Sequence, residues 1–286
     1  MSKIGTINST KSTISKHDFH IKKKFGQNFL IDQNILHKIV HIPDLTEDTL
    51  VVEIGPGFGS LTEYLISHSK HVLAYEIDKD LVPILLENFS DEKLTIINKD
   101  FLKCDIDDDI NALNITYDKA VVVANLPYYI TTPITLKIIE ESSIIKQMVL
   151  MTQQEVAQRI TSKPSTKDYN SLSIAIQYKT NATIALKVPR TVFIPAPNVD
   201  SAIVKLDIRE NIEKKPLSEK LFYEIVRSSF AQRRKTLVNN LHNKYGISKV
   251  ELADLLSQAD LNPLIRAENL SVSDFINLSD ILYSNM

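Results

Sequence analysis

Cysteine is almost absent from the sequence, and this limits the chemistry that the chain can perform. Cys104 is the only cysteine among 286 residues. One cysteine can form neither an intramolecular disulfide framework nor a cysteine metal site, so we predict no bound metal. A chain without disulfides is typical of a reducing compartment, and we therefore expect a cytoplasmic protein.

Long apolar stretches are absent as well. No run approaches the ~18 consecutive apolar residues of a membrane-spanning helix, so we expect no membrane partner. Residues 1–20 lack the apolar core of a signal peptide and contain no arginine, which argues against a mitochondrial presequence. This stretch is polar and rich in Ser, Thr and Lys, and we predict that it is a disordered tail.

The small net charge of −2 conceals three stretches of opposite sign. Residues 1–38 carry seven Lys against two Asp, a balance of +5, and residues 210–250 carry nine Lys and Arg against four Glu, again +5. Residues 47–118 carry sixteen acidic residues against five Lys, a balance of −11. Basic stretches on either side of an acidic centre favour a polyanion-binding protein, although ordinary solvated surfaces would give the same counts.

Glycine is scarce, and its distribution is uneven. The chain has six glycines, and three of them lie in the loop Gly55-Pro56-Gly57-Phe58-Gly59, between a predicted strand and a predicted helix. Glycine is used where the backbone must approach a ligand or adopt positive φ. The spacing is not the dinucleotide fingerprint G-x-G-x-x-G, and no Lys-Ser/Thr pair follows as in a P-loop, so a phosphate site is not favoured.

Acidic residues follow the predicted strands around this loop. Glu76 comes directly after a strand at residues 71–75. A carboxylate at this position can accept hydrogen bonds from both hydroxyls of a ribose. Asp100 follows a strand at residues 93–98 and could accept a hydrogen bond from the amino group of an adenine. Acidic surroundings disfavour pyrophosphate and favour a cationic cofactor with a ribose, such as S-adenosylmethionine. The alternative is that these carboxylates only cap turns or helices.

The sequence Asn125-Leu126-Pro127-Tyr128 follows a run of small apolar residues, which we predict to be a buried strand ended by Pro127. Ligands of open α/β sheets bind at such strand ends. The Asn side chain and the backbone carbonyls are hydrogen-bond acceptors, and Tyr offers a flat ring. This turn could therefore hold the amino group of a planar base, although an ordinary strand-ending turn is the alternative.

Predicted strands alternate with helices over residues 21–209, which indicates a doubly wound α/β sheet. A linker-like stretch begins at Glu210, and the residues after it show helical spacing only. We therefore predict an α/β domain at residues 21–209 and a smaller helical domain at residues 210–286. Positive charge in the helical domain concentrates at Arg227, Arg233, Arg234 and Lys235.

Eight motifs, taken in chain order, resemble those of the ribosomal RNA adenine dimethyltransferases. They are Gly26-Gln27-Asn28-Phe29-Leu30, Glu53-Ile54-Gly55-Pro56-Gly57-Phe58-Gly59, Glu76-Ile77-Asp78, Asp100-Phe101-Leu102, Asn125-Leu126-Pro127-Tyr128, Gln154-Glu155-Val156-Ala157-Gln158-Arg159, Phe193-Ile194-Pro195-Ala196-Pro197-Asn198-Val199-Asp200-Ser201-Ala202 and Phe230-Ala231-Gln232-Arg233-Arg234-Lys235-Thr236-Leu237. The resemblance implies a Rossmann-like, S-adenosylmethionine-dependent methyltransferase domain with a mixed, mostly parallel sheet, followed by a smaller all-helical domain.

The resemblance also implies roles for individual residues. The cofactor would be bound by Asn28, Leu30, Gly55, Gly57, Glu76, Asp100 and Asn125. The target adenine would be held and methylated at Asn125, Leu126, Pro127, Tyr128 and Phe193. The RNA would be bound by Lys22, Lys23, Lys24, Arg227, Arg233, Arg234 and Lys235.

The expected mechanism follows from the weakness of the nucleophile, since the lone pair of adenine N6 is conjugated into the ring. Acceptors at Asn125 and at the carbonyl of Leu126 or Pro127 would favour a pyramidal nitrogen whose lone pair points at the sulfonium methyl. No strong general base is required, because the methylated nitrogen becomes acidic. Tyr128 and Phe193, which looks exposed in its proline-rich loop, would stack on the extruded adenine.

Two activities within the family are candidates. One dimethylates two adjacent adenosines in the 3′-terminal hairpin of 16S rRNA in the pre-30S subunit, and the other dimethylates a 23S rRNA adenosine and gives macrolide resistance. The forms Val199-Asp200-Ser201-Ala202 and Asn125-Leu126-Pro127-Tyr128, with the extended segment Lys22–Leu30, favour the first, which we expect to act as a monomer.

Two rival functions are disfavoured by the residues at the site. A non-catalytic nucleic-acid-binding member of the fold would not need the acidic residues and Asn125, which are intact. A DNA N6-adenine methyltransferase would have Asp-Pro-Pro-Tyr at the catalytic turn, and Asn125 and Leu126 depart from that form.

Overall fold

The structure, a computed structural model of the chain, describes residues 3–89 and 92–285, without the side chain of Lys23. It forms two compact units. The first contains the chain up to Ala157 together with Asn181–Ile208, and the second contains Gln158–Thr180 together with the chain from Arg209 onward. This division differs from the predicted one at residues 158–180, which group with the helices.

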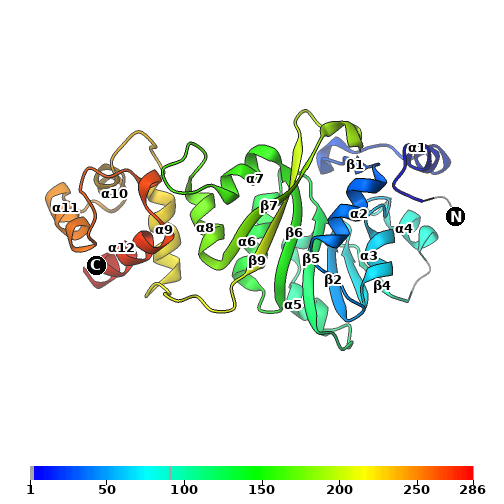
Figure 1. Cartoon of the computed structure of the whole chain (residues 1–286), viewed down its shortest axis with the longest axis horizontal. Helices are drawn as coiled ribbons and strands as arrows, with labels where there is room; N and C mark the ends of the chain where they lie inside the picture. The colour runs from blue at the N-terminus through cyan, green and yellow to red at the C-terminus, as the bar shows by residue number, and fades with distance from the viewer. Residues whose placement is uncertain (1–2, 90–91, 286) are drawn as a thin grey trace. The chain divides into compact units, whose positions relative to one another are not determined.

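The first unit is built on a seven-stranded sheet in the order β4-β3-β2-β5-β6-β9-β7 (Figure 1). The strands are β2 Thr49–Ile54, β3 His71–Tyr75, β4 Leu94–Ile97, β5 Lys119–Asn125, β6 Ile145–Gln153, β7 Thr180–Val188 and β9 Ser201–Ile208. Strands β4, β3, β2, β5 and β6 pair in parallel, and β9 is antiparallel to β6. This mixed, mostly parallel sheet confirms the predicted fold class. A separate ribbon pairs β1 Phe29–Leu30 with β8 Phe193–Ile194.

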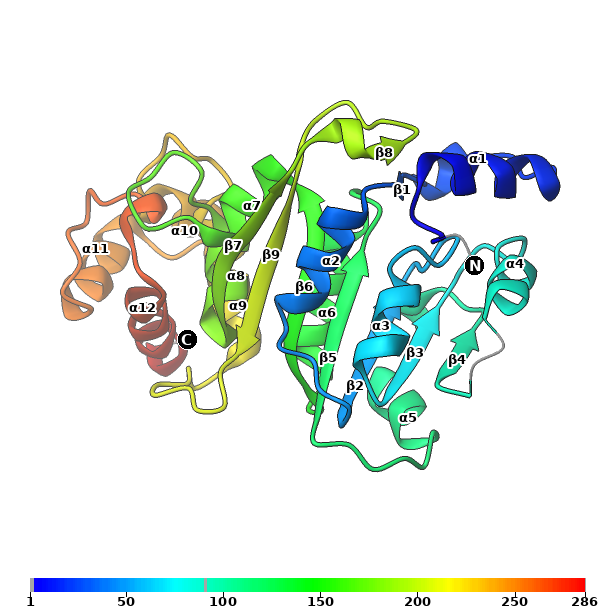
Figure 2. The same cartoon turned by 45° about the vertical axis from the view of Figure 1, so that its right-hand side comes forward.

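Helices cover both faces of the sheet. Helices α2 Gln33–His41 and α3 Thr62–His68 lie on one face and α6 Thr131–Glu141 lies on the other (Figure 2). Val121 and Val123 of β5 belong to the apolar cluster that contains side chains of α2 and α3, while the intervening Val122 is also fully buried. Burial on both faces explains why this strand is continuously apolar in sequence. Besides α1 Ile7–Lys16, the other described helical segments of this unit are α4 Val82–Asn88, α5 Ile106–Asn111, η1 Lys23–Phe25, η2 Phe101–Lys103 and η3 Arg190–Val192.

Helix α1, Ile7–Lys16, occupies the stretch that we predicted to be a disordered tail. The segment before it lies against α2, because the Gln33 side-chain amide donates to the Gly5 carbonyl at 2.6 Å and a Cβ at Gly5 would lie 2.3 Å from Leu36 Cδ1. After the helix, Phe19 is 7% exposed within an aromatic cluster. These partners are distant in sequence, and local composition therefore does not reveal them.

The second unit is helical (Figure 1). Helix α7 Gln154–Thr161 leads into it, and its other helices are α8 Ser171–Lys179, α9 Glu219–Ser229, α10 Leu237–Tyr245, α11 Lys249–Gln258, η4 Ala267–Asn269 and α12 Val272–Asn285. Helix α9 packs against α8, α10 and α12 around the fully buried Phe222 and Phe275. Within the described ranges, no helix has both the length and the apolar character needed to cross a bilayer.

Two tyrosine hydroxyls fasten residues 158–180 to the rest of the second unit. The Tyr178 hydroxyl donates to Glu219 of α9 at 2.9 Å. The Tyr169 hydroxyl donates to the backbone carbonyl of Leu270 at 2.8 Å, and the Tyr169 side chain is fully buried. These contacts give the physical reason why the segment belongs with the helices.

We predict that Tyr169→Phe destabilises the second unit, because it leaves the buried Leu270 carbonyl without a donor. The loss of such a bond costs about 1–2 kcal/mol, which corresponds to amide exchange about 5- to 30-fold faster in elements that open with the unit. Hydrogen–deuterium exchange at α12 measures this. Tyr283→Phe is the matched control, since Tyr283 lies on α12, where exchange is measured, and its side chain is 53% exposed. Identical exchange in the two variants would contradict the prediction.

Candidate functional site

A cavity of about 300 Å³ lies at the carboxyl ends of β2, β3 and β5 in the first unit. This edge of a parallel sheet is where α/β folds bind ligands. Most of its walls come from stretches within residues 25–30, 53–61, 75–77, 99–102 and 125–130. All residues predicted to bind the cofactor line this cavity, as do Leu126, Pro127 and Tyr128. The structure therefore brings together side chains that are about 100 residues apart in sequence.

The glycine-rich loop forms one wall of the cavity. Gly55 has φ +73°, and a Cβ built there would have no atom within 4 Å, so the backbone faces open space. Gly57 has φ +60°, and a Cβ there would lie 3.1 Å from the Phe29 ring. A side chain would strain both positions, and the loop therefore presents bare backbone to a ligand, as the glycine spacing predicts.

Two buried carboxylates stand beside this loop. Glu76 is 4% exposed, and its two oxygens accept from the backbone of Gly57 at 3.2 Å and of Asp78 at 2.8 Å. Burial raises the pKa of Glu76 to about 7, although these backbone donors oppose the rise. Glu53 is 1% exposed and accepts from the Thr62 hydroxyl at 2.6 Å, and burial raises its pKa to about 8.

Acidic residues outnumber basic ones in the lining of the cavity. Glu53, Glu76 and Asp100 face it from three different strand ends, and Lys99 is the one cation among the described lining residues. Asp100 also caps η2 by accepting from the Leu102 backbone at 3.1 Å. The capping role that we weighed as an alternative is thus present, and Asp100 lines the cavity at the same time.

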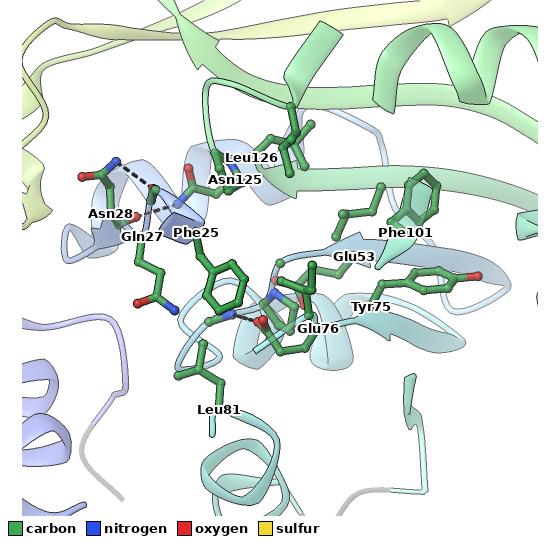
Figure 3. A pocket seen from close by; sticks show the side chains of 18 of the residues that line it. Phe25, Gln27, Asn28, Glu53, Tyr75, Glu76, Leu81, Phe101, Asn125 and Leu126 are labelled. Carbon is green, nitrogen blue, oxygen red and sulfur yellow. Dashed lines mark hydrogen bonds between the residues drawn. The ribbon is translucent and has the colours of Figure 1, made fainter. Parts of the chain in front are cut away.

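Asn125 lies at the end of β5, directly beside the N-terminal segment. Its side-chain amide donates to the Asn28 carbonyl at 3.1 Å, and the Asn28 side chain donates to the Gly26 carbonyl at 3.1 Å. Figure 3 shows this pair on one side of the cavity and Glu76 on the other. Because the nitrogen of Asn125 is engaged, the oxygen of its amide is the end available to a ligand.

The structure separates Leu126 from Pro127 as hydrogen-bond acceptors, which the sequence could not do. The Pro127 carbonyl accepts from the Ile130 backbone at 3.1 Å and from the Thr131 hydroxyl at 3.3 Å. The carbonyl of Leu126 accepts no hydrogen bond from the described residues. Leu126 is therefore the backbone acceptor that can serve a ligand together with Asn125.

The two aromatic residues predicted to stack on the target differ in position. Tyr128 lines the cavity and is partly buried. Phe193 is 3% exposed and packs in the apolar cluster with Leu30, its pairing partner in the β1–β8 ribbon. The expectation of an exposed aromatic at residue 193 was wrong, because the pairing of β8 with β1 turns the ring into the core. Within the described part of the chain, Phe193 is not among the residues that line the cavity.

The three N-terminal lysines predicted to bind RNA come just before residues 26–30, which cover the cavity and are called the covering segment below. Lys22 forms ion pairs with Asp78 and, at 2.6 Å, with Asp80, so its charge is neutralised within the unit. Lys24 is exposed, with its ammonium 4.7 Å from the centroid of the Phe25 ring. The side chain of Lys23 lies outside the described residues. Lys22 is thus less suited to phosphate binding than its place in a lysine run suggests.

The basic residues predicted to bind RNA in the second unit also fall into two groups: one is paired within the unit and the others are exposed. Arg233 donates to Glu268 at 3.0 Å and to the Lys167 carbonyl, so it supports the unit's own structure. Arg227, Arg234 and Lys235 are exposed, and their side chains make no ion pair or hydrogen bond to another described residue. These three cations remain available to a polyanion.

Some lining residues received no role from the sequence. The Gln27 side chain donates to Asp78 at 2.8 Å and accepts from the Lys22 backbone at 2.8 Å, which fastens the covering segment to the loop after Glu76. Its place inside the motif Gly26–Leu30 was the available signal. For Glu53, the signal was an acidic residue inside an otherwise apolar strand.

The site therefore combines bare backbone, buried carboxylates, and two acceptors at a strand end beside a tyrosine ring. Carboxylates suit a ligand with positive charge and hydroxyl groups, and they disfavour a phosphate. The acceptors at Asn125 and Leu126 suit an amino group. In these terms the residues present fit S-adenosylmethionine, a sulfonium with an ammonium group and a ribose.

Comparison with known proteins agrees with this chemistry. The family model described as ribosomal RNA adenine dimethylase matches residues 18–284. The chain is 49% identical to "Ribosomal RNA small subunit methyltransferase A" of Lactococcus lactis, over 98% of this chain and 96% of that protein. It is 47% identical to the protein of the same name from Bacillus pumilus, over 98% and 97%.

Two solved structures share the fold at the scale of the whole chain. A dimethyladenosine transferase from Plasmodium falciparum has a TM-score of 0.72 and 27% identity, covering 87% of this chain and 95% of that one. The 23S rRNA methyltransferase ErmE has a TM-score of 0.67 and 26% identity, covering 90% and 100%.

The family match extends over both units and includes every motif that forms the cavity. The chain is accordingly an enzyme, and S-adenosyl-L-methionine is its methyl donor. It belongs to the ribosomal RNA adenine dimethylase family.

Proposed function

We propose that this chain transfers methyl groups from S-adenosyl-L-methionine to N6 of two adjacent adenosines in the 3′-terminal hairpin of 16S rRNA, within the pre-30S subunit. The observation that carries the proposal is the pair of free acceptors at Asn125 and Leu126 beside a cavity with buried carboxylates. The small-subunit target is supported by the name of relatives that are 47–49% identical over nearly the whole chain. The 23S target is supported by a structure at 26% identity.

In the proposed complex the cofactor occupies the cavity between the glycine-rich loop and the N-terminal segment. Glu76 would accept hydrogen bonds from the ribose hydroxyls, Asp100 would accept one from the amino group of the cofactor's adenine, and the bare backbone of Gly55 and Gly57 would face the methionine part. Asn28 and Leu30 close the cavity from the N-terminal side. The burial of Glu76 and its position beside the loop support this assignment.

At the target base, the Asn125 amide oxygen and the Leu126 carbonyl accept the two N6 hydrogens. Holding both hydrogens on the acceptor side favours a pyramidal nitrogen whose lone pair faces the sulfonium methyl. Neither acceptor removes the proton, which leaves after transfer because methylation makes the nitrogen acidic. Tyr128 stacks on the extruded base, a contact worth about 1–3 kcal/mol. A stacking role for Phe193 would require its ring to leave the core.

The RNA is bound by exposed cations, for which Arg227, Arg234, Lys235 and Lys24 are the best supported. We propose that the enzyme acts as a monomer. Because the proposed substrate is a ribosomal precursor, we place the reaction in the cytoplasm.

Transfer of labelled methyl groups to immature small subunits, 23S RNA and duplex DNA in parallel tests the proposal. We expect label in N6,N6-dimethyladenosine of 16S rRNA only. Label confined to 23S RNA would establish the alternative target, and label on DNA would refute both.

We predict that Asn125→Ala lowers methyl transfer at least 100-fold while RNA affinity changes less than twofold, because the variant loses an acceptor that acts on the reacting amine. Single-turnover rates and filter binding measure the two quantities. Asn125→Asp is the isosteric comparison, since it keeps an acceptor but cannot donate to the Asn28 carbonyl. A normal rate in the Ala variant would exclude Asn125 from the chemistry.

We predict that cofactor affinity falls as the pH drops through about 7, because the pKa of Glu76 is raised to about 7 by burial. A bound cation lowers this pKa, so binding releases a proton and weakens by up to about tenfold per pH unit below the free pKa. Above that pKa the Glu76 carboxylate is already charged, and its contribution to the pH dependence of the affinity levels off. Isothermal titration at several pH values measures the profile.

Glu76→Gln provides the reference for that measurement. The α-amino group of the cofactor titrates in both proteins, so the difference between the two profiles isolates the protein carboxylate. We expect weaker binding and a flatter profile in the variant. Parallel profiles would show that Glu76 does not exchange a proton on binding.

We predict that replacing Arg234 and Lys235 together by Ala weakens RNA binding and reduces the slope of log K against log[salt] by about 1.4–1.8, as expected for two lost phosphate contacts. Cofactor affinity should not change. Lys146→Ala is the control, because Lys146 is exposed at the amino end of β6, away from the strand ends that form the cavity. If the double variant and the Lys146→Ala control gave equal slopes, Arg234 and Lys235 would not contact the RNA.

A further inference from the structure

The Tyr128 hydroxyl makes a hydrogen bond that base stacking by itself does not explain. Tyr128 lines the cavity, and its hydroxyl oxygen lies 2.7 Å from the Ser201 hydroxyl oxygen. The two residues are 73 positions apart in sequence and come from the catalytic turn and from β9. The bond therefore joins two motifs singled out in the sequence, of which Val199–Ala202 has no part in the chemistry described so far.

Ser201 stands in a firmly held part of the sheet. It is fully buried and pairs with Gln153 of β6 in the antiparallel register. The preceding residue, Asp200, accepts from the Gln154 backbone at 3.0 Å through its carbonyl and from the Arg190 backbone at 2.9 Å through its carboxylate. The backbone that carries the Ser201 hydroxyl is thus firmly held.

We propose that Ser201 is a positioning residue for methyl transfer, which fixes the plane of the Tyr128 ring for stacking on the target adenine. The inference rests on the proposed transfer to an adenosine amine in RNA, and it adds a residue to which no role has been given.

The physical argument is one of preorganisation. A tyrosine side chain rotates about two torsions, and the backbone holds only one end of it. A hydrogen bond to the hydroxyl holds the other end and removes the remaining freedom before the base arrives. Stacking then costs less ordering, and the amine is presented to the acceptors at Asn125 and Leu126 in a single orientation.

The hydroxyl is suited to this role at neutral pH. Burial raises the pKa of Tyr128, so the phenol keeps its proton and can donate to Ser201 or accept from it. A phenylalanine would offer the same ring face without the second attachment. Stacking requires only the ring of Tyr128, so it does not explain the hydroxyl.

A double-mutant cycle with Tyr128→Phe and Ser201→Ala tests the inference on the RNA that the wild-type enzyme methylates. Each substitution removes one partner of the same bond, so we expect each to lower kcat about three- to tenfold and the double variant to lose no more than either. Cofactor affinity should be unchanged, since neither hydroxyl faces the cofactor in the proposed complex.

A second readout separates positioning from a general loss of structure. With 2-aminopurine at the target position, stacking on an aromatic ring quenches fluorescence, and we expect less quenching in both single variants. Thr152→Val is the matched control, because Thr152 is fully buried on β6 beside Ala202 and its hydroxyl has no partner among the described residues. It should keep wild-type kcat and quenching.

The inference would be overturned if the losses of kcat in the two single variants multiplied in the double variant. It would also be overturned if Tyr128→Phe left both kcat and quenching unchanged. If Ser201→Ala fails to fold, Tyr128→Phe alone carries the test, since residue 128 is only partly buried. Failure of the proposed function is distinguishable, because it would appear in the wild-type enzyme as label on another nucleic acid.

Discussion

The hydrogen bond from the Asn125 side chain to the Asn28 carbonyl determines how the rest of the site can work. It joins the end of a central strand to the segment that covers the cavity, and it leaves the amide oxygen of Asn125 as the end available to a ligand. The Pro127 carbonyl is engaged within its own turn, which leaves Leu126 as the second acceptor. Two hydrogen-bond acceptors at one strand end suit an amine that is a poor nucleophile, and the proposed mechanism depends on this geometry more than on proton transfer.

A second constraint is the cost of burying carboxylates before the cofactor arrives. Glu53 and Glu76 are almost inaccessible to water, and burial raises the pKa of each toward or above neutrality. Backbone donors from Gly57 and Asp78 offset part of that cost at Glu76. A cation in the cavity offsets more of it, so the charge of the methyl donor complements a site that is unfavourable when the donor is absent.

The sequence predicted the sheet and the cavity well, because both depend on local signals. Apolar runs identify the strands, and the residues directly after them converge at one sheet edge by the rule of parallel topology. Phe193 was misjudged because its burial results from the pairing of β8 with β1, which no local pattern encodes. Lys22 and Arg233 looked available to RNA in sequence, but partners such as Asp78 and Glu268 lie far along the chain. The segment 158–180 shows the same limit, since contacts to distant helices decide its grouping.

The aromatic cluster behind the glycine-rich loop has a practical consequence for handling the protein. The Phe19 ring packs edge-on against Phe58 at 5.2 Å, and Phe58 stacks on Phe29 at 4.1 Å. The polar stretch that composition marks as a disordered tail thus packs, through Phe19, against two rings that line the cavity. Trimming it to improve crystals would expose two aromatic rings and loosen the loop that they support. Deletions and affinity tags are therefore better placed at the opposite terminus.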